Sequence, residues 1–362
     1  MKQKVLLGLS GGVDSAVAAL ILKEQGYEVI GAFLKCFSNN KNQITSECNY
    51  IEDKKEAQKI SSILKIKFIE LDYEKEYAKT VMEPMFKAYS KGITPNPDSL
   101  CNKTIKFPYL WKEAKKHNCN LIATGHYIKK IKNNNKYYLK IPKDQSKDQS
   151  YFLYHLTQKD LNHSIFPIGN YTKAEVRNIA RQNNFPNWDK KGTKGLCFIG
   201  NINMKQFLKQ KIKNKQGIIK NPENEIIGKH DGIMFYTIGE RMKENSEVKI
   251  DNKYKNKVKS KLYVSKKNIK RNELTIAPKN HKILKNSKFY IKKINWMSGK
   301  PKSQEILIRT RHLGKLVNAK IKKEKNKIKI NLKEPIQGIA EGQSAVIYSK
   351  SKIMLGGGEI SY

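Results

Sequence analysis

The 362-residue sequence contains no C-x-x-C pair among its five cysteines, which are Cys36, Cys48, Cys101, Cys119 and Cys197. A zinc ribbon or a cysteine-ligated iron–sulfur cluster therefore lacks sequence support, and we expect no structural metal. The odd cysteine count argues against a disulfide framework. No stretch approaches the ~18 consecutive apolar residues of a membrane span, and no cleavage site follows the short apolar run at the N-terminus. We therefore expect a cytoplasmic protein without a membrane partner.

Acidic residues and arginine are also scarce. The chain has 72 basic and 32 acidic residues, a net charge of +40, and only six of the basic residues are arginine. Lysine, asparagine and isoleucine all have AT-rich codons, so base drift could supply part of this charge. Drift should be even along the chain, however, whereas residues 251–330 hold 26 basic and four acidic residues, a net charge of +22. This unevenness favours a surface that faces a polyanion.

The first third of the chain alternates short apolar runs with segments of helical periodicity. The predicted strands are 4–9, 28–34, 67–71 and 120–124, and the predicted helices are 14–25, 52–64, 73–89 and 102–117. We expect residues 91–100, with Pro95 and Pro97, to form a rigid loop. A β-hairpin is predicted from residues 127–131 and 136–141. A helix with a capping box is predicted over residues 172–182. The alternation predicts an α/β fold with a parallel, doubly wound sheet.

The pattern changes after about residue 205. Short β-type runs recur between Gly, Pro and Asn, and helical periodicity is absent. The predicted strands are 217–219, 233–237, 261–264, 273–276, 289–294, 305–309, 327–332 and 344–348. We expect a catalytic domain at 1–204, a small central β-rich domain at 205–275 and a second β-rich domain at 276–362.

A phosphate-binding motif stands between the first strand and the first helix. It reads Ser10-Gly11-Gly12-Val13-Asp14-Ser15. Glycines let backbone N–H groups turn toward an anion, and the helix N-terminus adds its positive dipole end. The motif is not a Walker A sequence, because it lacks G-K-[ST]. It resembles the PP-loop of N-type ATP pyrophosphatases, which cleave ATP between the α and β phosphates to form an adenylate.

Two cysteines stand in settings that favour reactivity. Cys101 follows the proline loop at the expected start of a helix, three residues after Asp98. A helix N-terminus favours the thiolate, so we expect a lowered pKa for Cys101. Cys197 lies between Gly195 and Gly200, after a lysine-rich stretch that would also lower a thiol pKa. Cys119 lies outside both loops and reads as structural. Two such thiols without a metal motif suggest sulfur transfer or a catalytic disulfide.

With these motifs the sequence resembles the bacterial tRNA-specific 2-thiouridylases almost from end to end. The segments that carry the resemblance are 10–15, 94–107, 124–127, 147–153, 195–200, 236–241, 342–346 and 355–358. The family installs sulfur at C2 of the wobble uridine in the tRNA anticodon loop. Its architecture implies a PP-loop domain, a small central domain and a C-terminal β-barrel.

The resemblance implies roles for individual residues. The catalytic residues would be Cys101, Cys197 and Asp98. ATP, with Mg²⁺, would contact Gly8, Leu9, Ser10, Gly11, Gly12, Val13, Asp14, Ser15, Leu34 and Gly125. The tRNA would contact Asn96, Pro97 and Asp98 at the target base, and His126, Lys147, Asp148, Gln149, Arg309, Thr310 and Gln343 elsewhere. For His126 a hydrogen-bonded structural role is an equal alternative, and for Lys147 and Asp148 a solvated ion pair.

In the implied mechanism ATP adenylates the uridine C2 oxygen and Cys197 carries a persulfide. A sulfur-relay or cysteine-desulfurase protein would supply the sulfur. Cys101 would either attack the persulfide to release hydrosulfide, leaving a disulfide with Cys197, or assist direct attack by the persulfide. The chain departs from the family pattern at Leu34–Phe37, Gly192, Glu240 and Glu341, which leaves the catalytic residues intact.

Two alternatives stay open from the residues alone. One is another PP-loop tRNA-modifying ligase without sulfur chemistry, similar to lysidine synthetase, which would have no use for the two thiols. The other is a non-catalytic basic RNA-binding protein, which would not release pyrophosphate from ATP.

Overall fold

A computed structural model describes residues 2–38, 50–192, 195–200, 202–301 and 303–362. Its N-terminal domain is built on a parallel sheet with the strand order β3-β2-β1-β4-β7. The strands are β1 (Lys4–Gly8), β2 (Glu28–Lys35), β3 (Lys67–Asp72), β4 (Leu121–Thr124) and β7 (Ser164–Ile165). All neighbouring pairs are parallel, so the predicted α/β sheet is confirmed.

Helices cover both faces of this sheet, because successive strand side chains point to opposite sides. Val5 and Leu7 pack in one apolar cluster, whereas Leu6 packs in another. The first cluster includes residues of α1 (Val13–Glu24), α2 (Tyr50–Leu64) and α8 (Lys173–Gln182), and the second includes residues of α6 (Phe107–Lys116). The predicted capping box of α8 is present. The doubly wound arrangement is therefore confirmed.

Two predicted helices contain a wider turn. The segment 73–89 forms α3 (Glu74–Tyr77), the π-helical turn η1 (Ala78–Met82) and α4 (Glu83–Ser90). The segment 102–117 starts earlier than predicted, with α5 (Pro97–Cys101), the π-helical turn η2 (Asn102–Lys106) and then α6. The expectation of a loop throughout 91–100 is thus wrong for its end. Asn96 caps α5 through Ser99 N–H, and Pro97 takes the first helical position, where a missing N–H costs nothing.

The central domain is a mixed sheet with the order β10-β9-β8-β12-β11. Its strands are β8 (Gly217–Lys220), β9 (Ile226–His230), β10 (Lys249–Ile250), β11 (Leu262–Asn268) and β12 (Glu273–Pro278). The predicted strand 233–237 is wrong, because Ile233–Phe235 forms the 3₁₀ turn η5. The expected absence of helices is also wrong. Asn203 caps the short helix α9 (Met204–Lys209), and Asp251 caps α10 (Asn252–Val258), so side-chain caps act where periodicity is too short to detect.

The C-terminal domain is a closed antiparallel barrel, as the family resemblance implied. The strands run in the order β13-β16-β15-β14-β17-β18, and β13 also pairs with β18. Their bounds are β13 (Lys285–Asn295), β14 (Glu305–Arg309), β15 (Val317–Glu324), β16 (Lys327–Gln337), β17 (Ser344–Tyr348) and β18 (Ile353–Ser361).

The predicted hairpin forms as β5 (Lys129–Asn133) and β6 (Lys136–Lys140). It connects the N-terminal domain to the C-terminal barrel. Asn134 and Asn135 connect the strands with φ of 45° and 58°, as a two-residue hairpin turn requires. Strand β6 pairs with β18 at the edge of the barrel sheet. The hairpin of the first domain therefore anchors the barrel.

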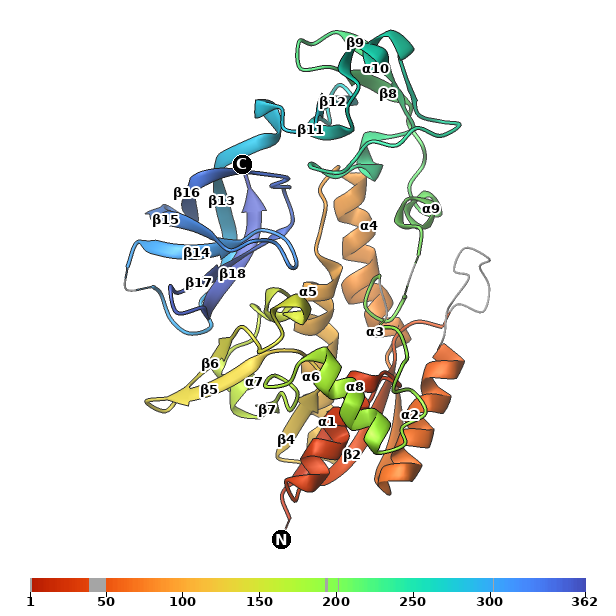
Figure 1. The fold of residues 1–362 in the computed structure, drawn as a ribbon, viewed down its shortest axis with the longest axis vertical. Helices are drawn as coiled ribbons and strands as arrows, with labels where there is room; N and C mark the ends of the chain where they lie inside the picture. Colours follow the sequence, from red (N-terminus) through yellow and green to blue (C-terminus); the bar gives the residue numbers. More distant parts are fainter. Residues whose placement is uncertain (1, 39–49, 193–194, 201, 302) are drawn as a thin grey trace.

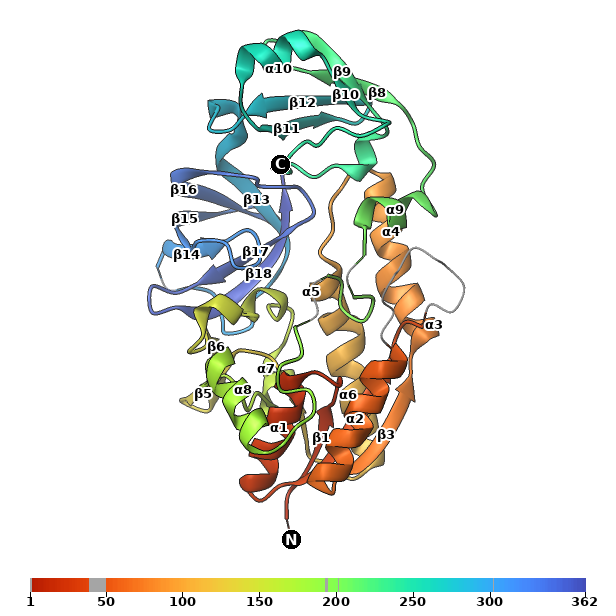
Figure 2. The same cartoon turned by 45° about the vertical axis from the view of Figure 1, so that its right-hand side comes forward.

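Figures 1 and 2 show the N-terminal domain at one end of the elongated molecule and the central sheet at the other, with the barrel beside them. Helix α4 extends from the first domain toward the central domain in both views. In the part of the chain described here, no helix is both long and apolar enough to cross a membrane.

Candidate active site

The structure brings together the two thiols that the sequence analysis singled out. The Sγ atoms of Cys101 and Cys197 lie 3.7 Å apart, although the residues are 96 positions apart in the chain. Cys101 ends α5, and Cys197 lies in a tight loop that Leu196 and Gly200 close by pairing their backbones. Gly200 has a φ of 85°, which favours glycine at this position. Both sulfurs are free thiols at a separation from which a small movement would allow a bond.

Hydrogen bonds hold the backbone of Cys197 on both sides. Its N–H donates to Oδ1 of Asp98 at 2.8 Å, and its carbonyl accepts from the Tyr77 hydroxyl at 2.7 Å. The next residue, Phe198, has a φ of 67° and meets the Tyr77 ring edge-on at 5.9 Å. Asp98 thus positions the Cys197 loop, a contact that the sequence did not reveal.

The two thiols differ in acidity, and one expectation is wrong. Burial raises the pKa of Cys101, which is 0% exposed, so the helix N-terminus does not make it the thiolate. The hydrogen bond from Cys101 and the charge of Lys106 lower the pKa of Cys197. Cys197 is therefore the sulfur that ionises first, and Cys101 is the protonated donor beside it.

The cation beside Cys197 is not the one expected from the sequence. Lys190 of the lysine-rich stretch pairs with Asp53 at 2.7 Å, and Lys194 lies outside the described residues. Lys106 instead reaches the thiol site from η2, with Nζ 5.5 Å from the Phe198 ring centroid. Sequence reasoning missed Lys106 because it stands five residues after Cys101, a spacing that shares a helix face only in a π turn.

The PP-loop forms a compact turn at the end of β1. Ser15 Oγ accepts from the Ser10 N–H at 3.1 Å and donates to the Gly12 carbonyl at 3.0 Å. Gly11 has a φ of 74°, and a Cβ there would lie 2.1 Å from the Asp53 carbonyl oxygen. The remaining residues predicted to contact ATP here lie in or beside this turn: Gly8, Leu9 and Val13. The turn leaves the start of α1 as a site for phosphates.

Asp14 joins the PP-loop to two other segments. Its Oδ1 accepts from Lys173 Nζ at 2.6 Å and from the Tyr127 hydroxyl at 2.8 Å. Gly125 packs closely on the start of α1, where a Cβ would lie 2.9 Å from Ser15 N. Leu34 is buried near the carboxyl end of β2, the edge at which parallel sheets bind ligands. Lys173 is a second cation that the sequence analysis did not identify.

The barrel holds the proline loop that precedes α5. Gln343 Nε2 donates to the Pro95 carbonyl at 2.8 Å, and Asn96 Nδ2 donates to Ser344 Oγ at 3.1 Å. A Cβ on Gly342 would lie 2.8 Å from the Thr94 carbonyl oxygen. Pro97 is buried at the start of α5. Residues expected to contact the target base and the tRNA therefore meet across the domain boundary.

Other residues expected to contact tRNA make internal contacts. Arg309 and Asp148 form a buried ion pair, with Arg309 6% and Asp148 0% exposed, so Asp148 is not in a solvated pair with Lys147. Thr310 is also buried, whereas Lys147 is exposed. The Gln149 side chain accepts from the Tyr127 N–H at 2.8 Å.

His126 makes the contacts expected of a hydrogen-bonded structural histidine, the alternative to a tRNA contact in the sequence analysis. It is 6% exposed, shares a hydrogen bond of 2.8 Å with Thr124 Oγ1 and stacks on Phe107. Burial, with a smaller contribution from Lys106, holds the pKa of His126 well below its usual value. It is thus a neutral ring within the core in this conformation.

The basic segment 251–330 carries its charge on the surface of the central sheet and the barrel. Its exposed cations include Lys253, Lys257, Lys261, Lys266, Lys270, Arg271, Lys279, Lys282, Lys285, Lys288, Lys300, Arg311, Lys315, Lys320, Lys322, Lys323 and Lys325. Such a surface suits a polyanion.

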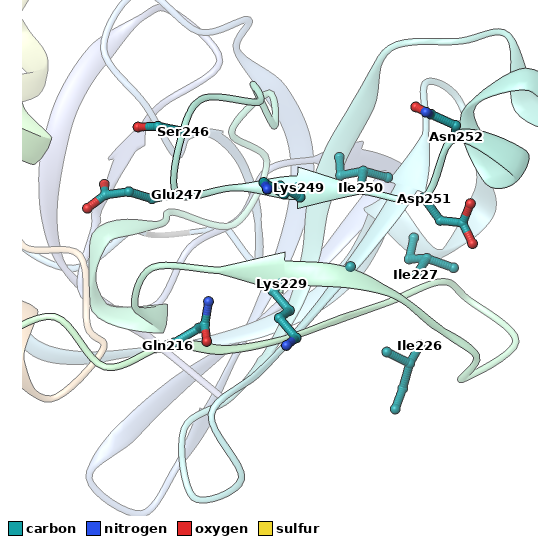
Figure 3. Close-up of a pocket in the computed structure, with 11 residues that line it drawn as sticks. Gln216, Ile226, Ile227, Lys229, Ser246, Glu247, Lys249, Ile250, Asp251 and Asn252 are labelled. Carbon is teal, nitrogen blue, oxygen red and sulfur yellow. The ribbon is translucent and has the colours of Figure 1, made fainter.

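A cavity of about 630 Å³ lies in the central domain, away from the thiols. Figure 3 shows its lining side chains around β9 and β10, including Lys229, Glu247 and Ile250. Because its lining residues all lie within 216–252, it is separate from the site described above. Among the described residues, no group of three or more His, Cys, Asp or Glu side chains could hold a metal ion.

Known proteins match this chain over almost its full length. Residues 3–201 match the tRNA methyl transferase HUP domain, residues 205–278 the tRNA methyl transferase PRC-barrel domain, and residues 286–360 the aminomethyltransferase β-barrel domain. The tRNA-specific 2-thiouridylase MnmA of Mycoplasma genitalium is 40% identical over 370 residues, covering 98% of each chain. That of Nitrosomonas europaea is 37% identical over 371 residues, covering 99% of this chain and 98% of its own.

Proposed function

This chain belongs to the family of tRNA-specific 2-thiouridylases, and we propose how its residues divide the work of transferring sulfur to C2 of the wobble uridine of tRNA. The observation that carries the proposal is the contact of 3.7 Å between the Cys101 and Cys197 sulfurs. A ligase without sulfur chemistry has no use for this pair, and neither has a binding protein. The full-length relatives, rather than the methyl-transfer names of the domain models, decide between sulfur and methyl chemistry.

The PP-loop binds ATP and activates the uridine. The Gly11 turn brings backbone N–H groups and the α1 N-terminus toward the phosphates. Mg²⁺ bound with the phosphates would offset their negative charge, and the Asp14 carboxylate of the PP-loop would be the residue to hold it. The uridine C2 oxygen attacks the α-phosphorus, and pyrophosphate leaves. AMP is then the leaving group at C2.

Cys197 carries the sulfur because its thiolate is the more stable of the two. A sulfur-donating protein transfers one sulfur to it, forming a Cys197 persulfide. In one route the Cys101 thiolate attacks Cys197 Sγ, breaks the S–S bond and releases hydrosulfide, which attacks C2 and displaces AMP. The resulting disulfide then requires two electrons from a thiol reductant. In the other route the terminal persulfide sulfur attacks C2 directly and AMP leaves. Cys101 then attacks Cys197 Sγ and breaks the S–S bond, which frees the 2-thiouridine and forms the same disulfide, to be reduced in the same way.

The Asp98 carboxylate holds the Cys197 loop by accepting a hydrogen bond from the Cys197 N–H. Burial raises the pKa of the Asp98 carboxyl. A carboxyl of raised pKa can exchange a proton with Cys101 or the uridine during either route. The proline loop, fixed by Gln343 and Ser344, presents Asn96 and Asp98 to the flipped base.

The tRNA lies over the basic surface of residues 251–330, with Lys147 as a further phosphate contact. We place this reaction in the cytoplasm, where tRNA is modified. The catalytic domain spans 1–204, the central domain 205–275 and the barrel domain 276–362.

The test is persulfide labelling of cysteine variants followed by nucleoside analysis of the tRNA. Cys197→Ser should lose both persulfide loading and 2-thiouridine formation. Cys101→Ser should load persulfide and fail to turn over. The matched control is Cys119→Ser, because Cys119 is buried away from both loops and should retain activity. Full 2-thiouridine formation by Cys197→Ser would refute the proposed roles.

A further inference from the structure

The π turn η2 places a lysine beside the reactive sulfurs. The backbone hydrogen bonds of a π turn join residues five apart rather than four, so Lys106 at its end lies over Cys101 just before its start. Single π turns inside α-helices are rare, and they occur often at functional sites. With α-helical spacing, Ile105 would take that place and put an apolar group against the thiols. The π turn thus places a cation, rather than an apolar side chain, beside the two thiols.

The position of Lys106 is fixed from the Cys197 side as well. Its Nζ lies 5.5 Å from the ring centroid of Phe198, the residue after Cys197. Phe198 is held with a positive φ against Tyr77, which also binds the Cys197 carbonyl. The Lys106 ammonium and the Cys197 sulfur also act on each other through their charges, and each favours the charged form of the other. The lysine therefore lies against the loop at the Phe198 ring, and its charge acts on the Cys197 sulfur.

The charges around the Cys197 sulfur come from several elements. Those acting on it or on its immediate neighbours are Asp98 and Cys101 of α5, Lys106 of η2, Cys36 beyond β2, Tyr77 of α3 and, through Asp98, His312 of the barrel. Burial and Asp98 disfavour an anion at Cys197, whereas the hydrogen bond from Cys101 favours it. Within the described part of the chain, Lys106 is the cation that opposes them. Although burial disfavours its charge, the Cys197 sulfur keeps the pKa of Lys106 raised.

We propose that Lys106 is a further catalytic residue, which holds the Cys197 sulfur anionic as a thiolate and then as a persulfide. This inference rests on the sulfur-transfer function proposed above. In the thiolate, Lys106 pairs with the sulfur that attacks the donor protein's persulfide. In the persulfide, it pairs with the terminal sulfur before that sulfur reaches uridine C2 or leaves as hydrosulfide. Lys106 gives up no proton in these steps and acts only through its charge.

The test measures thiol reactivity without ATP, tRNA or a sulfur donor. Iodoacetamide alkylation of Cys197 is followed by mass spectrometry of its peptide between pH 5 and 10, in the full-length protein. Lys106→Met should raise the midpoint of the pH profile by at least about one unit, which slows alkylation at neutral pH about tenfold. Lys106→Gln should do the same while keeping a polar group, and Lys106→Arg should keep the low midpoint.

Lys103→Met is the matched control, because Lys103 lies on the same turn and is exposed. It should leave the Cys197 profile unchanged. A folded Lys106→Met or Lys106→Gln protein with the wild-type midpoint would overturn the proposal. Because the assay needs no thiolation, the two proposals can fail separately. A shifted midpoint in the Lys106 variants, together with no 2-thiouridine formation by the wild-type protein, would refute the proposed function and leave the role of Lys106 standing.

Discussion

Replacing Asp148 with asparagine should destabilise the junction between the first domain and the barrel. Asp148 lies in the first domain and Arg309 in β14, and both are buried. Without the carboxylate, the Arg309 guanidinium keeps the Tyr348 ring, 5.5 Å from its centroid, but has no ion pair with another of the residues that the structure describes. Leaving one member of a buried pair uncompensated costs about 3–5 kcal/mol. We expect Asp148→Asn and Arg309→Met each to lose free energy of unfolding on this scale.

The double variant makes the test specific. Asp148→Asn combined with Arg309→Met removes both charges, and replacing a whole buried pair is often close to neutral. The double variant should therefore be more stable than either single variant. Urea unfolding followed by tryptophan fluorescence measures all three, and Lys147→Ala, next to Asp148 but exposed, is the control that should remain within about 0.5 kcal/mol of the parent. Additive losses in the double variant would refute the buried-pair argument.

The same variants decide whether Arg309 contacts tRNA. If Arg309 binds only Asp148, Arg309→Met should leave unchanged the slope of log affinity for tRNA against log salt concentration. A phosphate contact would reduce that slope by about one. Lys147→Ala should show such a reduction. A reduced slope for Arg309→Met would show that the ion pair opens when tRNA binds.

Three further predictions concern separate parts of the molecule. Asp14→Ala should abolish AMP release while tRNA still binds, because Asp14 lies at the phosphate turn; release at the parent rate would refute the PP-loop assignment. If residues 251–330 face the tRNA backbone, log affinity should fall with log salt by about 0.7–0.9 per neutralised phosphate, and a slope near zero would assign these lysines to base drift. Burial lowers the pKa of His163, stacked on Trp111, to about 4, whereas the unfolded chain binds this proton near pH 6.5. Stability should therefore fall as pH drops from 6.5 to 4, by about 3 kcal/mol more than in His163→Phe, and an equal pH dependence in the two proteins would contradict this.

The sequence by itself determined the elements whose signals are local. Apolar runs and helical periodicity located β1 to β4 and the helices between them, since each pattern reports burial over a few neighbouring residues, whereas the two-residue strand β7 was not predicted. The capping box at Thr172 and the Asn134-Asn135 turn were equally readable, because side-chain chemistry sets the backbone at those positions. The motifs around Cys101 and Cys197 identified both thiols.

Only the tertiary structure decided how those thiols differ. The acidity of a thiol depends on burial and on charges that arrive from distant segments. Cys101 stands in the first turns of a helix, yet burial outweighs the helix dipole and keeps it protonated. The cation near Cys197 is Lys106, 91 positions away in the chain, rather than the neighbouring lysines. A π turn that no sequence pattern announces brings it there.

The pairing of Asp148 with Arg309 has the same origin. Each residue on its own reads as a charged surface group suited to tRNA. Their burial follows from the barrel docking on the first domain, through β6 and the contacts of Gln343 and Ser344. Local patterns determine backbone conformation, because φ and ψ respond to neighbouring residues. The partner of a charge depends on which surfaces meet, and only the folded chain brings those surfaces together.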